Sequence, residues 1–206
     1  MSCQALYEIV ALIKDIFTIL AAIVAGYVAV AGVNTWRKQL TGKTEYEVAR
    51  RLLRATYALR DAIRSVRSPF MSGGEIASAM ERVGIEPEPG QVQTPLPVRR
   101  AAYEERWKEV TDALSTLSAE AFEAEVLWGE GVTSALTPLR GAVNVLHANL
   151  LIHLDTDSFA PRIPQVPDDR PTIEAVVFGH YDLSDEFGTK VLDAVAKVEN
   201  FVRPHM

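Results

Sequence analysis

Residues 16–33, IFTILAAIVAGYVAVAGV, decide the fold, because this stretch contains eighteen residues without a charge. As an α-helix it would extend about 27 Å, close to the thickness of the hydrocarbon core of a bilayer. No polar stripe interrupts it at helical spacing, as one would in a helix with a solvated side. The sequence therefore predicts one transmembrane helix, with residues 1–36 as tail and membrane helix and residues 37–206 as a separate domain.

The charges on the two sides of this run predict its orientation. Residues 37–67 carry nine Lys or Arg and three acidic residues, whereas residues 1–36 carry one Lys and two acidic residues. Segments rich in Lys and Arg stay on the cytoplasmic side of a membrane. We therefore expect the N-terminus outside and residues 37–206 in the cytoplasm.

A cleaved signal peptide is the alternative interpretation of the same run. Ala29, Val30 and Ala31 fit a small-x-small cleavage site, which would remove the first 31 residues. Against cleavage, the segment before the run has no net positive charge, and Arg37 and Lys38 follow soon after it. The sequence favours the membrane helix and leaves the question of cleavage open.

Small residues recur on one side of the run. Ala21, Ala25 and Ala29 are four residues apart, a spacing that lets two helices approach closely in a membrane. The sequence therefore offers this face as a site at which two copies of the chain associate.

The clearest helix after the run spans residues 44–67. Thr44 and Glu47 have the spacing of a capping box, and a Ser-Pro pair follows Arg67. Apolar residues fall on one arc of this helix, and the opposite arc carries five arginines: Arg50, Arg54, Arg60, Arg64 and Arg67. Because an unpaired buried charge is strongly destabilising, we expect these arginines to be exposed or paired.

This basic arc has three interpretations. It is a solvated face that pairs with acidic residues, a surface for anionic lipid headgroups, or a nucleic-acid site. Residues 68–206 carry eleven basic and twenty-two acidic groups, which would repel phosphates, so no nucleic-acid partner is expected.

The rest of the chain predicts an all-α fold, a helical bundle after the membrane helix. Helical patterns cover residues 75–83, 98–128, 132–154 and 184–202, and the two longest are joined by a short Gly-Glu-Gly turn. Proline-rich loops are expected at residues 85–97 and 156–172. Residues 173–178, IEAVVF, remain undecided between strand and helix.

The sequence contains few candidates for chemistry. His153, Asp155 and Asp157 could together hold a metal, and His180 with Asp182 could supply a general base. The preferred interpretation of both groups is exposed or hydrogen-bonded side chains near helix ends. The chain has no phosphate-binding loop or nucleophile elbow, and its single cysteine, Cys3, excludes an internal disulfide. We expect no catalytic, cofactor or metal site, and an enzyme is not the preferred interpretation.

Three stretches carry a resemblance to known sequences: WRKQLTGKTEYEVARRLLRATYALRDAI at 36–63, FEAEVLWG at 122–129, and DEFGTKVLDAVAKVENFVRPHM at 185–206. They resemble a group of bacterial proteins with one N-terminal membrane helix, a helical body and no assigned activity. The resemblance implies a bacterial inner-membrane protein.

Together these features predict a single-pass membrane-anchored helical interaction module with an unidentified protein partner. The alternatives are a toxin, immunity or defence component at the membrane, and a metal-dependent hydrolase that uses His153, Asp155 and Asp157.

Overall fold

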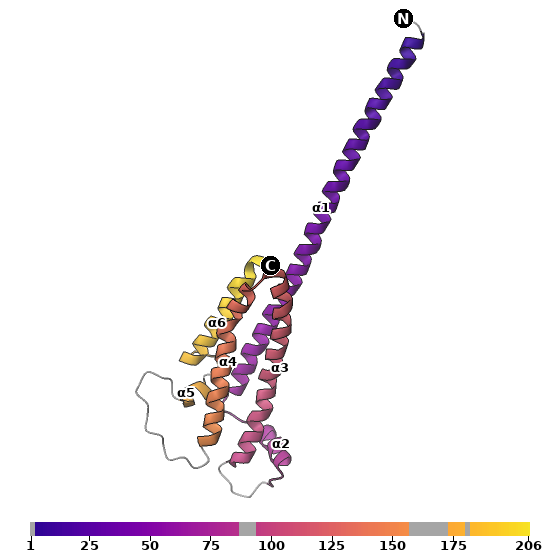
Figure 1. Ribbon diagram of the computed structural model, residues 1–206. Helices are drawn as coiled ribbons and strands as arrows, with labels where there is room; N and C mark the ends of the chain where they lie inside the picture. The colour runs from indigo at the N-terminus through magenta and orange to yellow at the C-terminus, as the bar shows by residue number, and fades with distance from the viewer. Residues whose placement is uncertain (1–2, 87–93, 157–172, 180–181) are drawn as a thin grey trace. The chain divides into compact units, whose positions relative to one another are not determined.

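The computed structural model describes residues 3–86, 94–156, 173–179 and 182–206. Within them, the side chains of residues 3–13, 15, 16, 19, 21–23, 30, 34, 35, 37–41 and 156 are outside the description. All regular elements in the described part are helical, as the all-α prediction requires (Figure 1). They are α1 Cys3–Val66, α2 Gly73–Val83, α3 Leu96–Trp128, α4 Gly131–Thr156, α5 Ile173–Val177, α6 Glu186–Val202 and the 3₁₀ turn η1 Arg203–His205.

Helix α1 begins well before the predicted start at Thr44. Its backbone is helical from Cys3 to Val66, so the expected capping box at Thr44 and Glu47 is wrong. A Thr caps a helix only where an extended backbone enters it, and here the residues before Thr44 are already helical. The chain nevertheless divides close to this position into two compact units, Met1–Tyr46 and Glu47–Met206.

The first unit carries large apolar side chains that are exposed. Phe17 is 68% exposed, Val24 60%, Tyr27 76% and Val28 61%. Among the residues that the structure describes, no helix is both long enough and apolar enough to cross a membrane. Within residues 16–33, the side chains of six residues are not described.

The second unit is a helical bundle with one main core. In Figure 1, α4 lies between α3 and α6, and it contacts both. The apolar arc predicted for residues 44–67 faces this core, with Leu52, Leu59 and Ile63 fully buried. A smaller cluster, built on Ala79 and Val98, joins α2 to α3. The bundle prediction is thus confirmed for the described part of residues 47–206.

Several helix ends follow from local sequence. Ser72 and Glu75 form a complete capping box at the start of α2, and Gly84 ends this helix with φ of 67°, a conformation that favours glycine. The helical pattern predicted from residue 184 begins at Glu186 in α6, with Asp185 as its N-cap, whose side chain accepts a hydrogen bond from the backbone N–H of Gly188.

Two regions left open by the sequence are partly described. Residues 173–177 form the short helix α5 rather than a strand. The first predicted loop covers residues 85–97, but α3 begins at Leu96, two residues before the predicted end of the loop. Residues 87–93 lie outside the description. The second predicted loop covers residues 156–172. Its first residue, Thr156, is the last residue of α4, and residues 157–172 lie outside the description.

Candidate functional site

The five arginines predicted to share one arc of α1, exposed or paired, divide into three groups. Arg50 and Arg54 are exposed, and neither forms an ion pair within the described part of the chain. They lie on a shallow groove of about 550 Å³ whose apolar lining includes Leu53, Tyr57 and Met206. The groove joins two cationic side chains to an apolar floor and is also lined by Asp61, which pairs with Arg60 and Arg64. Cationic side chains beside an apolar surface suit an amphiphilic anion.

Arg60 and Arg64 form the second group and are about one-quarter exposed. Asp61 lies between them, at 2.9 Å from Arg60 and 3.6 Å from Arg64. The Arg60 guanidinium also lies over the Tyr57 ring, 5.0 Å from its centroid. Because one carboxylate serves both arginines, this end of the face is less positive than the end formed by Arg50 and Arg54.

Tyr57 fixes the basic face to the last helix. Its hydroxyl donates a 2.8 Å hydrogen bond to the Glu199 carboxylate on α6. This bond, more than burial, raises the pKa of Tyr57 above its usual value. The contact holds α1 and α6 side by side at the groove.

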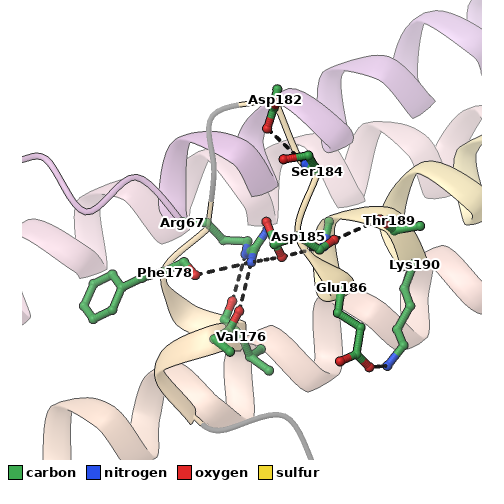
Figure 2. Close-up of polar contacts among 11 residues, drawn as sticks. Arg67, Val176, Phe178, Asp182, Ser184, Asp185, Glu186, Thr189 and Lys190 are labelled. Atoms are coloured by element: carbon green, nitrogen blue, oxygen red, sulfur yellow. Dashed lines mark hydrogen bonds and ion pairs between the residues drawn. The ribbon is translucent and has the colours of Figure 1, made fainter.

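Arg67 is paired rather than exposed, so its assignment to a lipid-facing surface was wrong. Its side chain is 1% exposed and lies among α5, α6 and the end of α1 (Figure 2). The helical register accounts for this, because the Arg67 N–H still donates to the Ile63 carbonyl at 3.1 Å and Arg67 lies about 40° from the buried Ile63 around the helix. Arg67 therefore lies at the edge of the basic arc, beside the apolar arc of α1.

The Arg67 guanidinium connects three chain segments. It donates to the backbone carbonyls of Val176 at 2.8 Å and Ala175 at 3.1 Å, and forms a two-pronged pair with the Asp185 carboxylate at 2.7 and 3.2 Å (Figure 2). Those carbonyls belong to the C-terminal end of α5, where positive charge is favoured. The Phe187 ring covers the guanidinium at 4.8 Å.

Two further residues adapt the backbone to this arginine. Asp185 pairs with Arg67 while its side chain also caps α6 at the Gly188 N–H, 2.9 Å away. Gly179 donates its N–H to the Arg67 carbonyl at 3.2 Å, and a Cβ at Gly179 would overlap the guanidinium. We name Arg67, Asp185 and Gly179 the arginine clamp. The arginine clamp joins the end of α1 to α5 and to the start of α6.

Sequence reasoning missed a second buried arginine, Arg106, which is 7% exposed. It pairs with Glu75 at 2.7 Å and donates to the carbonyls of Ser68 and Phe70, at 2.7 and 2.5 Å. The bond to Arg106, followed by the capping contacts at Ser72, lowers the pKa of Glu75 from 4.5 to about 2. The capping-box pattern identifies Glu75, but no pattern in the sequence singles out Arg106.

Arg51 was also overlooked. It binds Glu120 at 2.9 Å and also pairs with Glu123, and so joins α1 to α3. The hydrogen bond to Glu120 raises the pKa of Arg51. The only signal in the sequence is that Glu120 and Glu123 are spaced to lie on one side of a helix. Their partner Arg51 is 69 residues before Glu120, so the pattern does not identify it.

The predicted metal residues are not brought together where they are described. His153 contacts the Phe178 ring edge-on at 5.0 Å, and Asp155 pairs with Arg100 at 2.8 Å. Asp157 and His180 lie outside the described residues. Across the described ranges, no three His, Cys, Asp or Glu side chains gather in a way that could hold a metal ion.

The predicted self-association face of Ala21, Ala25 and Ala29 is only partly described by the structure. Ala25 and Ala29 are exposed, and the side chain of Ala21 lies outside the description.

Comparison with known proteins gives no further guidance to function. No family model, curated protein or solved structure matches this chain. The function is therefore argued from the residues themselves.

Proposed function

We propose that the protein is a single-pass membrane-anchored helical interaction module of the bacterial inner membrane. The observation that carries the proposal is the exposure of large apolar side chains in the first unit, from Phe17 at 68% to Tyr27 at 76%. Each such side chain gains on the order of 1.5–3 kcal/mol when it leaves water. The uncharged run at residues 16–33 supplies a stretch of the length that a bilayer requires.

The bundle of residues 47–206 is proposed to lie in the cytoplasm. Support comes from the excess of Lys and Arg in residues 37–67, which favours retention on that side. Arg50 and Arg54 are the proposed contacts for anionic lipid headgroups, since they are exposed and lie beside an apolar groove. Arg60 and Arg64 contribute less, because they share Asp61.

The anchor is tested by fractionating cells that express the full chain. We expect the protein to remain with membranes through high-salt and carbonate washing. Replacing Val24 and Val28 together by Lys places two charges near the centre of the run, at about 2.5–3.5 kcal/mol each. This variant should leave the membrane fraction or be degraded, because its insertion is no longer favourable.

The matched control places two Lys residues at exposed positions of α3, Thr111 and Thr116. It adds the same charge and should fractionate as the wild type does. Recovery of wild-type protein in the soluble fraction at full mass contradicts the anchor. Recovery at a mass reduced by about 31 residues, the length that ends at Ala31, supports cleavage of a signal peptide instead.

A further inference from the structure

We infer that the groove beside Arg50 and Arg54 binds one anionic phospholipid molecule, with the headgroup at these two arginines and one acyl chain along the apolar floor. We name it the α1 groove, and its lining consists of Arg50, Leu53, Arg54, Tyr57, Ala58, Asp61 and Met206. The inference rests on the lipid contact proposed above for Arg50 and Arg54. It goes further because it assigns a place in the protein to the apolar part of the ligand.

The α1 groove has an excess of positive charge. Arg50 and Arg54 are exposed, and within the described part of the chain neither has an ion-pair partner. Asp61, the acid that lines the groove, is shared by Arg60 and Arg64 at 2.9 and 3.6 Å. Because Asp61 already has two cationic partners, it does not offset Arg50 and Arg54, and these two arginines attract an anion.

The two arginines are placed to bind one phosphate together. Arg50 and Arg54 are four residues apart on α1, so their side chains are neighbours on the same side of the helix. A guanidinium presents parallel N–H donors that match the oxygens of a phosphate. A headgroup phosphate bound here has its acyl chains next to the apolar part of the α1 groove.

The length of the α1 groove fits one acyl chain. Its lining extends along α1 from Arg50 to Asp61, eleven residues further on, which is about 16 Å at the rise of an α-helix. The hydrocarbon core of a bilayer is about 30 Å thick, so the chains of one leaflet span about 15 Å. A chain that starts at the two arginines therefore reaches along the whole floor.

The floor is apolar and is held in place by the bundle itself. Leu53 and Tyr57 are half-buried and pack against the main core, and the exposed Ala58 lies next to Tyr57 in the chain. The Tyr57 hydroxyl donates to Glu199 at 2.8 Å, and the Arg60 guanidinium lies 5.0 Å from the centroid of the Tyr57 ring. A floor that is already ordered binds a chain with little further loss of entropy.

Met206 adds a side chain from the other end of the sequence to the α1 groove. It is 57% exposed, and its flexible thioether adapts to apolar surfaces of different shapes. An acyl chain in the groove would remove Met206 and Leu53 from water, which is favourable. A free phosphate would leave this floor in water, and a neutral lipid would leave Arg50 and Arg54 without a counterion, so an anionic phospholipid fits best.

Photo-crosslinking of the full chain tests the inference. The protein is reconstituted into phosphatidylcholine vesicles that also contain phosphatidylglycerol with a photoactivatable diazirine in one acyl chain. Peptide mass spectrometry then locates the lipid adducts. We expect adducts at Leu53, Tyr57 or Ala58, in addition to adducts in residues 16–33. The matched probe is phosphatidylcholine with the same diazirine, which should label residues 16–33 and not the α1 groove.

Two variants separate the cationic part of the site from its floor, with yields at residues 53, 57 and 58 normalised to those in residues 16–33. Arg50→Gln with Arg54→Gln should lower the yield of groove adducts by about thirtyfold, the effect of two charges near a lipid surface. The matched control, Lys108→Gln with Lys197→Gln, makes the same charge change at exposed positions and should not alter the yield. Met206→Gln leaves the charge unchanged and makes the floor more polar, so it should lower the yield by about fivefold.

Adducts confined to residues 16–33 would overturn the inference and leave the anchor standing. Equal labelling of the α1 groove by the two photoactivatable lipids would also overturn it, as would groove adducts that survive Arg50→Gln with Arg54→Gln. Groove adducts without adducts in residues 16–33 would support the lipid site and contradict the anchor. The absence of adducts in both places would overturn both proposals.

Discussion

Replacing Arg67 by Met tests whether the arginine clamp holds the end of the bundle together. The substitution keeps an unbranched side chain of similar length but removes every hydrogen bond that the guanidinium makes. It leaves the Val176 carbonyl and the Asp185 carboxylate without their partner in the interior. We therefore expect a large loss of stability, and we do not expect α1 itself to unravel.

The magnitude follows from the burial of the pair. Removing one member of a buried ion pair typically costs about 3–5 kcal/mol. Asp185 remains 19% exposed and keeps its hydrogen bond from Gly188, so the lower end, about 3 kcal/mol, applies here. With a urea dependence of about 2 kcal/mol per molar, the unfolding midpoint should fall by about 1.5 M.

The assay is urea unfolding of the purified full chain, followed by tryptophan fluorescence, since Trp107 and Trp128 lie in the second unit. Arg54→Met is the matched control, because it makes the same chemical change at an exposed position and should leave the midpoint unchanged. A shift for Arg67→Met no larger than the control's would refute the reasoning.

The double variant Arg67→Met with Asp185→Asn separates the ion pair from the helix cap, which Asn preserves. Each single change already breaks the same pair. The double variant should therefore lose less stability than the sum of the two singles. Additive losses would show that the two residues act independently.

Three further predictions concern other parts of the second unit. Because the pKa of Glu75 is lowered from 4.5 to about 2, its contribution to stability is complete above pH 4.5 and is lost as the pH falls through 2. Melting temperatures of Glu75→Gln should therefore depend less on pH across this range than those of the wild type. Gly179→Ala should lower the melting temperature because its Cβ overlaps the buried guanidinium, whereas Gly73→Ala, with open space around it, should not. A shortened chain that begins at residue 43 should bind anionic vesicles and dissociate from them as the salt concentration rises. Replacing Arg50 and Arg54 together by Gln should weaken this binding by about thirtyfold, at about 1 kcal/mol per charge. Unchanged binding would exclude the electrostatic contact.

The sequence predicted the helices of the bundle well because their patterns are local. The apolar arc with Leu52, Leu59 and Ile63 repeats at helical spacing, and these residues are buried as expected. Ser72 and Gly84 mark the two ends of α2 through backbone chemistry that involves only neighbouring residues.

The site residues were harder to predict because their environment comes from distant segments. Arg67 and Arg54 are about 140° apart in a helical projection, and Arg67 borders the apolar arc, about 40° from the buried Ile63. The sequence does not show the partners that accept the buried Arg67 guanidinium, because Val176 and Asp185 are more than one hundred residues away. Arg106 is similar, since its partners Ser68 and Phe70 belong to a turn with no periodicity.

The arginine clamp also has a consequence for the order in which the bundle can form. Arg67 and Asp185 are separated by 118 residues, so a growing chain exposes the guanidinium long before its counterion has been synthesised. During that interval α1–α4 can collapse around their apolar faces, but burying an arginine without a counterion opposes closure at this end of the bundle. We therefore expect α5 and α6 to dock late in folding, with Arg67 in water until Asp185 reaches it.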